Sequence, residues 1–385
     1  MISTLSCSFR FSQAITTLQQ AHLYMNIDTR AVSTSLVILA TIAVFYVLVV
    51  GQAFLVPLAV ALMVWYVINA LSRTFARILP ATLLPEDNKP NWLTLILALL
   101  SIGFLFSLAI DMVSSNITQV RAAAPEYKAN FDILISKLSA NSQYDILANV
   151  QIAVTNLKIA PIIQTLASTF TNMIGNVSIV LFYVMFMLLE QGTFQKKITA
   201  IFPDQNQRGS VMSILTHAQE DIQTYLWIKT LTSTITGMVS YGVLLAVGVD
   251  FAGFWAFTIF MLNFIPTIGS IIATLFPAIL ALIQFDTVGP FLIVLIGVGA
   301  VQVVVGNFLE PKLMGNSLNV SPFVVMMSLT LWGSIWGIAG MFLSVPITVM
   351  LLIAFAHFEK TRYIAILLSG DGNLKFADNK DINIT

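Results

Sequence analysis

The chain has 385 residues, of which 57% are hydrophobic and only 9% are charged, and its formal net charge at pH 7 is zero. Because soluble domains carry about 25% charged residues, this composition excludes an ordinary soluble protein and predicts a polytopic membrane protein. The neutral balance gives no indication of a nucleic-acid partner, and the single cysteine, Cys7, excludes an intrachain disulfide and a multi-cysteine metal site.

The first 32 residues are predicted to form an N-terminal cytoplasmic tail. No apolar stretch follows Arg10, and no cleavage site of a signal peptide is evident. Met25 would be an ordinary start just before the first span. Residues 1–24 are therefore interpreted either as an over-long start or as a disordered or interfacial tail.

Six apolar stretches are each near the roughly 20 residues that a helix needs to cross a bilayer. They are 33–50, 54–71, 92–110, 170–189, 230–247 and 288–308. Between them, the apolar spacing around 131–138 predicts helices outside the bilayer, and that of 214–227 predicts a helix on the membrane surface. The predicted division is 1–32 (tail), 33–112 (first three spans), 113–167 (extracytoplasmic amphipathic helical segment), 168–190 (fourth span), 191–229 (cytoplasmic interfacial helices), 230–356 (transport core) and 357–385 (cytoplasmic tail).

Two further apolar stretches, 254–285 and 322–355, are interrupted near their middles by proline or glycine, which break or loosen a helix. At membrane depth such a break is tolerated only where protein buries the freed backbone groups or where they line a wet cavity. Two interrupted segments in one half of a chain are typical of a transporter's binding site. We therefore expect an all-α polytopic fold of about six full spans and two broken, re-entrant hairpins.

The distribution of positive charge favours hairpins of opposite orientation. Cytoplasmic loops are enriched in Lys and Arg, and two re-entrant hairpins place 14 of the 18 basic residues in the cytoplasm. The same arrangement indicates a weak inverted repeat, since Gly269 precedes Pro277 by eight residues and Gly337 precedes Pro346 by nine. The alternative is two ordinary kinked helices in a passive bundle.

Three motifs in the second half of the chain are similar to those of one family. They are NFIPTIGS at 263–270 with Pro277, EPKLMG at 310–315 with Pro322, and Gly333, Gly337, Gly340 and SVP at 344–346. In type, order and spacing they resemble the signature of the AI-2E family of bacterial membrane transporters, over roughly residues 30–360. The resemblance implies a homo-oligomeric, multi-pass exporter of the quorum-sensing signal autoinducer-2 in the bacterial inner membrane. Some family members are linked instead to sodium or lithium/proton antiport.

No charged residue lies in the middle of a predicted span, whereas a proton-coupled pump usually has an intramembrane carboxylate. We therefore expect a small, uncharged polar substrate and no cofactor or metal, with Na⁺ or H⁺ as the candidate coupling ion. The expected substrate-binding residues are Asn263, Pro266, Thr267, Gly269, Ser270, Gln302, Asn307 and Ser334. The expected gating or coupling residues are Glu310, Lys312, Asp250 and Asp286. The three histidines, His22, His217 and His357, are interpreted as interfacial polar residues.

Several of these residues also have a purely structural interpretation. Asn263 and Gln302 would then hydrogen-bond neighbouring helices, and the hydroxyls of residues 230–236 would bond their own helix backbone. Glu310 would pair with Lys312 or Arg362, or stay a solvated carboxylate at the interface.

The predicted function is secondary transport, as an exporter of a small polar molecule such as autoinducer-2. The alternative is a sodium or lithium/proton antiporter, for which Asp250, Asp286 and Glu310 would have to reach a wet cavity. An enzyme is not expected, because the spans contain no paired acids, Ser–His set or metal cluster. A scaffold acting through residues 113–166 is disfavoured by the modest size of that loop and by the two broken segments.

Overall fold

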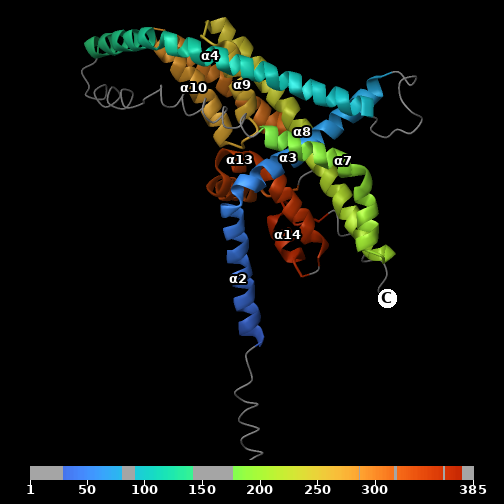
Figure 1. Ribbon diagram of the computed structural model, residues 1–385. Coiled ribbons are helices and arrows are strands. Elements are labelled where there is room, and N and C mark those ends of the chain that lie inside the picture. The colour runs from blue at the N-terminus through green and yellow to red at the C-terminus, as the bar shows by residue number, and fades with distance from the viewer. Residues whose placement is uncertain are drawn as a thin grey trace, which may run out of the picture. The chain divides into compact units, whose positions relative to one another are not determined.

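The computed structural model describes residues 29–79, 92–141, 177–285, 287–315, 319–358 and 360–374, and the regular elements in these ranges are helices (Figure 1). This confirms the all-α fold. The chain divides into two units, Met1–Leu55 and Val56–Thr385. The first contains α2 (Thr29–Val50), whose large side chains, such as Leu36 and Tyr46, are exposed and apolar, as on a lipid-facing helix.

Seven helices in the described residues are long and apolar enough to cross a membrane, and two shorter apolar helices accompany them. They include all six predicted spans. The long ones are Val32–Val50, Gln52–Ile78, Trp92–Met112, Val177–Phe194, Gln207–Val247, Val288–Met314 and Pro322–His357, and the shorter ones are Ala252–Leu262 and Ile268–Gln284. The protein is thus a multi-pass membrane protein.

The helix α4 is longer than the predicted third span. It runs over Trp92–Asn141 as one helix of 50 residues, whereas the span was expected to close at Asp111. Residues 104–141 contain no glycine, and their one proline, Pro125, does not end the helix. The rest of the predicted extracytoplasmic segment, 142–167, lies outside the described residues, as do 170–176 at the predicted start of the fourth span. The helix of that span, α7, is Val177–Ile201.

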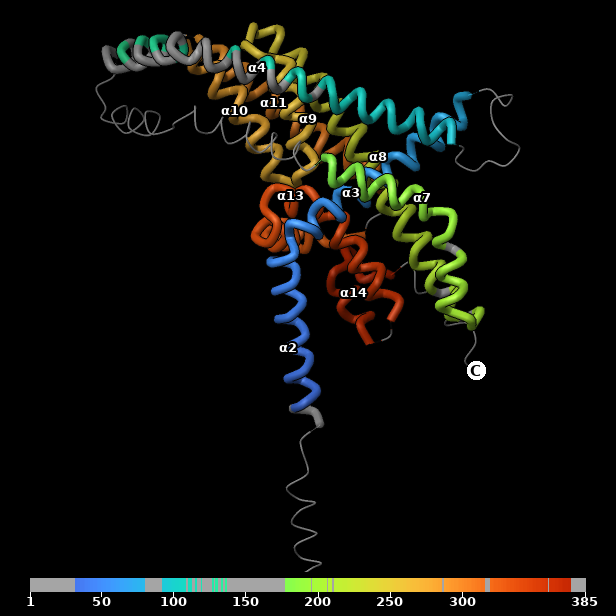
Figure 2. Tube along the Cα trace, in the orientation of Figure 1, coloured from blue at the N-terminus to red at the C-terminus, as the bar shows by residue number. Residues whose placement is uncertain are grey.

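The helix α8 (Gln205–Val247) joins two elements that the sequence analysis separated. A surface helix over 214–227 and a span beginning at residue 230 were expected, but a single helix of 43 residues covers both (Figure 2). Its interior has a physical reason to continue, because no proline or glycine occurs between Gly209 and Gly237. The expected separation was wrong, and Lys229 lies in the interior of one helix rather than at the end of an interfacial segment.

Both predicted breaks are confirmed. The first lies between α9 (Ala252–Leu262) and α10 (Ile268–Gln284), where Thr267 has φ 58° and ψ −59°. The second lies inside α13 (Pro322–His357), where Gly337 has φ 61° and ψ −140°. Re-entrance of these segments into the bilayer stays a prediction.

At both breaks, the helical segments before and after the break, here called its two arms, approach each other closely. A Cβ at Gly269 would lie 1.8 Å from the carbonyl oxygen of Leu262, and one at Gly340 would lie 1.9 Å from that of Trp332. Real Cβ atoms do not approach so closely, so both positions require glycine. In this respect the counterpart of Gly269 is Gly340 and not Gly337, the glycine that the predicted spacing had paired with it. The inverted repeat itself stays a prediction.

The remaining span, residues 288–314, is not a uniform α-helix. It consists of α11 (Val288–Val304), the π-helix η2 (Val305–Leu309) and α12 (Glu310–Met314). Pro311 has no backbone N–H and so cannot donate to the carbonyl four residues earlier, which weakens the helix at this point. A short helix, α14 (Arg362–Leu368), follows α13 and contacts it.

The long helix α8 is the common partner of the broken segments. It contacts α9, α11, α12 and α13, while α10 packs on α9 and α11. Leu244 of α8 belongs to a buried apolar cluster that includes Val294 and Val298 of α11. Nearer the N-terminal end of α8, Tyr225 and Leu226 pack in a second cluster with residues of α13 and of α3 (Gln52–Ile78). The polar residues of α8 lie between these clusters.

Candidate transport site

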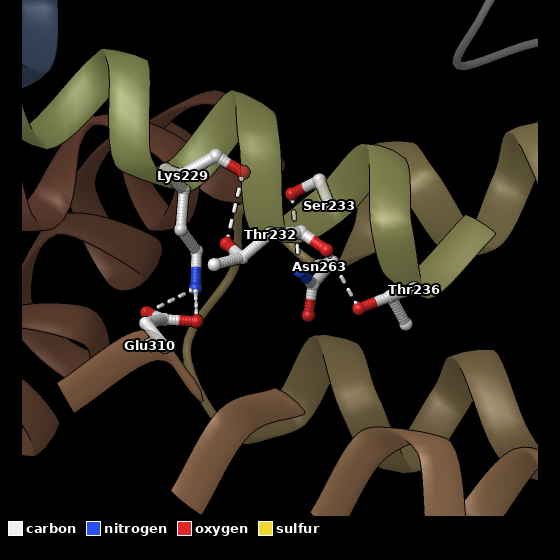
Figure 3. A network of polar contacts seen from close by, with 6 residues as sticks. All are labelled: Lys229, Thr232, Ser233, Thr236, Asn263 and Glu310. Carbon is white, nitrogen blue, oxygen red and sulfur yellow. Dashed lines mark hydrogen bonds and ion pairs between the residues drawn. The ribbon is translucent and has the colours of Figure 1, made fainter. Parts of the chain in front are cut away.

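One face of α8 is polar although it is buried. Thr232, Ser233, Thr236 and Ser240 recur at the three- and four-residue spacing of a helix face, and all four have no exposed surface. Figure 3 shows the first three of them. Thr236 Oγ1 donates to Thr232 O at 2.8 Å, and Thr232 Oγ1 donates to Lys229 O at 3.2 Å. These contacts confirm that hydroxyls of this stretch bond their own helix backbone.

The first break faces this polar side of α8. Asn263, the residue after α9, is buried, and its Nδ2 donates to Ser233 Oγ at 3.0 Å (Figure 3). On its other side the break reaches α13, where the ring centroids of Phe264 and Phe342 are 5.1 Å apart. Among the hydrogen bonds of the described residues, the carbonyl oxygens of Asn263 and Phe264 have no donor. The break therefore supplies an amide to the hydroxyls of α8, and its turn contains backbone acceptors without a donor among the described residues.

The helix α11 adds a second amide to the same region. It runs antiparallel to α8, because Glu310 just beyond it meets Lys229, while Gly297 approaches Val243. This register places Gln302 at about the level of residue 237 of α8. Gln302 is only 8% exposed, and its Nε2 has no hydrogen-bond partner in the described part of the protein.

Ser240 is in the same condition as Gln302, since its buried Oγ also finds no partner among the described residues. Both lie one turn beyond the apolar cluster of Leu244 and Val298, on the side toward the ion pair of Lys229. The five uncharged residues of this region will be called the polar strip: Ser233, Thr236, Ser240, Asn263 and Gln302.

The polar strip ends at a buried ion pair. Lys229 Nζ lies 2.7 Å from Glu310 Oε1 and 2.9 Å from Oε2 (Figure 3). The two side chains are only 6% and 17% exposed. Glu310 was expected to pair with Lys312 or Arg362, to act as a gate or to stay a solvated carboxylate, and Lys229 was expected outside the span, so this partner was missed. The signal was the absence of any helix breaker around Lys229.

Several predicted site residues lie apart from the strip. Asn307 and Lys312 are exposed, and Ser334 is exposed and donates to Thr330 O of its own helix at 2.8 Å. Asp250 lies beyond the far end of α8, where Tyr127 Oη donates to its Oδ2 at 2.8 Å. Since Lys229 and Val247 are 18 residues apart in one helix, about 27 Å separate the two ends. Asp286 lies outside the described residues.

The other predicted residues of the first break are arranged around its turn. Thr267 is exposed, and its Oγ1 lies 3.5 Å from Met326 Sδ of α13. Pro266 and Ser270 are half-buried, and Gly269 is the buried contact with Leu262. These residues shape the turn, whereas Asn263 is the one that points its polar group toward α8.

Comparison with known proteins agrees with this architecture. The model of the family described as AI-2E family transporter matches residues 36–360. The chain belongs to the AI-2E transporter family. The AI-2 transport protein TqsA of Escherichia coli (strain K12) is 29% identical over 82% of this chain and 89% of its own length. A Haemophilus influenzae protein, provisionally named a transport protein, is 33% identical over 72% of this chain and 82% of its own length.

The family match fixes the broad function. The protein is a multi-pass membrane transporter and not an enzyme. The match also confirms the resemblance that the motifs at 263–270 and 310–315 indicated, because both lie inside the matched range. The polar strip and the ion pair lie in the same range, between residues 229 and 310.

Proposed function

We propose that the protein exports a small, uncharged, oxygen-rich molecule such as autoinducer-2 across the bacterial inner membrane, and that the polar strip binds it. The observation that carries the proposal is the unused hydrogen-bonding capacity at Ser240 and Gln302. A buried polar group without a partner costs about 1–3 kcal/mol. A ligand oxygen that accepts from Gln302 Nε2 would remove this cost, so the strip is suited to hydroxyl or carbonyl groups.

The charges around the strip favour an uncharged cargo over a cation. The five residues of the strip carry no formal charge, and the Glu310 carboxylate is neutralised by Lys229 at hydrogen-bonding distance. A cation would meet a carboxylate that already has its counter-ion. This arrangement favours export of a neutral molecule over the sodium or lithium/proton antiport that was the alternative.

The relatives support the cargo and the cellular context of the proposal. The name of TqsA assigns it to transport of AI-2, and that relative aligns with most of this chain. Export of autoinducer-2 would place the protein in quorum sensing. The driving force would be an ion gradient or the concentration gradient of the cargo itself.

Flux measurements in everted inner-membrane vesicles test this function. Vesicles that contain the protein should take up labelled autoinducer-2 faster than vesicles without it, and imposed sodium and proton gradients should show any coupling ion. Gln302→Leu keeps the size of the side chain but removes its amide, and we expect at least a tenfold lower uptake, equivalent to about 1.4 kcal/mol. Asn307→Leu is the matched control, since Asn307 is an exposed amide in the adjoining η2.

Two outcomes would contradict the proposal. Equal uptake with and without the protein would exclude autoinducer-2 as cargo under these conditions. Uptake that Gln302→Leu and Asn307→Leu leave equally unchanged would remove the polar strip as the binding site. A sodium-driven pH change in the same vesicles, without uptake of autoinducer-2, would favour the antiporter.

A further inference from the structure

The ion pair of Lys229 and Glu310 closes one end of the polar strip. Lys229 lies one turn before Ser233 on the same face of α8, so the pair is the neighbour of the Ser233–Asn263 hydrogen bond (Figure 3). The opposite end of the strip is blocked by the apolar cluster of Leu244 and Val298. Along α8, the strip is therefore bounded by an apolar cluster at one end and by the ion pair at the other.

Stability alone is a weak reason for a buried ion pair. Both charges lose hydration when they are buried, and replacing such a pair by apolar side chains of similar size is often neutral or stabilising. A charged pair differs from an apolar pair in a second respect. When the two groups separate, each is strongly hydrated, so the open state is far less unfavourable than it would be for two apolar side chains.

Lys229 and Glu310 belong to helices that differ in length and regularity. Lys229 lies in the interior of α8, a continuous helix of 43 residues. Glu310 begins α12, which has five residues and follows the π-helix η2, and the next residue is Pro311. Irregular π-helical turns frequently occur at functional sites, and proline removes a helix hydrogen bond at this position. α12 is therefore the shorter and less regular of the two elements that carry the ion pair.

We propose that Lys229 and Glu310 form a charge latch that holds α12 against α8 at the end of the polar strip and separates once in each transport cycle. Lys229 and Glu310 are positioning residues in this mechanism, because they control access to the strip and do not bind the cargo. The proposal rests on the proposed transport function, but it does not depend on which molecule is carried.

Replacing the ion pair by two apolar side chains distinguishes a latch from a contact that only stabilises the fold. In Lys229→Met/Glu310→Met the buried contact is kept, but the closed state is favoured because opening would expose two apolar side chains. We expect a protein with unchanged thermal stability in detergent and at least a tenfold lower flux of labelled autoinducer-2. The charge swap Lys229→Glu/Glu310→Lys restores an ion pair and should transport within a few-fold of the original protein. Flux within twofold of the original protein in the Met/Met variant would overturn the latch.

Cysteine labelling tests the latch independently of the cargo. In a Cys7→Ser background, Thr236→Cys places one thiol in the strip, two turns beyond Lys229 and without exposed surface. Glu310→Gln leaves Lys229 charged and unpaired, so the latch should open, and a small hydrophilic thiol reagent should react at least fivefold faster. The Met/Met variant should react no faster than the original protein. Ala98→Cys is the control, because Ala98 lies in another buried cluster, formed by α3, α4 and α7.

The two readouts keep the proposals distinguishable. If autoinducer-2 is not carried at all, the proposed cargo fails, but the labelling rates still decide the latch. Equal labelling of Thr236→Cys with and without Glu310→Gln would overturn the latch, whatever the flux shows.

Discussion

The two broken helices share a backbone design but differ in their polar content. Each has one residue with positive φ, Thr267 or Gly337, and each brings a glycine of the second arm onto a carbonyl of the first. At the first break the buried amide of Asn263 bonds α8, whereas Ser334 near the second break is exposed and bonds its own helix. The shared design thus provides the shape, and in the described residues the amide of Asn263 at the first break reaches another helix, whereas the hydroxyl of Ser334 at the second does not.

The largest expected effect concerns the shape that both breaks share. Gly269→Ala and Gly340→Ala would each place a Cβ less than 2 Å from a backbone oxygen, so the two arms must separate. Because backbone has to move, we expect a loss of about 3 kcal/mol of unfolding free energy at either break. Thermal unfolding in detergent measures it. Gly306→Ala is the control, since no heavy atom lies within 4 Å of its added Cβ. Unequal losses at the two breaks would contradict the shared design.

Substitutions at the two break residues with positive φ should change thermal stability in opposite directions. A Cβ at Gly337 meets no atom within 4 Å, so Gly337→Ala adds only backbone strain, at a cost of about 1–3 kcal/mol. Thr267 is β-branched and already bears such strain, so Thr267→Gly should raise the thermal unfolding temperature. In the described residues, the hydroxyl of Thr267 makes one hydrogen bond, a weak one to Met326 Sδ. A lower unfolding temperature for Thr267→Gly would show that the turn is held by its side chain.

Substitution of the polar group at each break should affect transport differently. Asn263→Ala removes the amide that bonds Ser233, and we expect about a tenfold lower flux, which corresponds to about 1.4 kcal/mol. Ser334→Ala removes a hydroxyl that bonds only its own helix and should change flux by less than twofold. Flux of labelled autoinducer-2 measures both variants side by side. Similar losses in the two variants would mean that the second break also carries polar cargo.

The sequence was sufficient for the parts of the fold that depend on local composition. Apolar length identified the spans, and Pro266 and Gly337 identified the breaks, because these residues act on their own backbone. It was not sufficient where a distant partner decides. Lys229 was interpreted as a surface residue, but it is buried against Glu310, which is 81 residues later in the chain.

The sequence was sufficient to predict a site of uncharged polar residues near the first break, but not to predict which residues form it. Asn263 and Gln302 were selected as polar residues near the break, and both are buried as that choice requires. Asn307, five residues beyond Gln302, is exposed. Since an α-helix has 3.6 residues per turn, a residue five positions on points about 140° away and lies on another side of the span. The choice of both residues rested on their amides and not on the helix face they share with the break. A homo-oligomer, which the family resemblance implied, stays a prediction.

The most direct test of the polar strip is protection of a thiol by the cargo. In the Cys7→Ser background, Ser240→Cys would be labelled with a small thiol reagent in membranes, with and without autoinducer-2. A bound cargo would occupy the space next to this position, so labelling should slow at least threefold, while labelling of Ala98→Cys should not change. If autoinducer-2 is transported but leaves the labelling rate of Ser240→Cys unchanged, the polar strip is not its binding site.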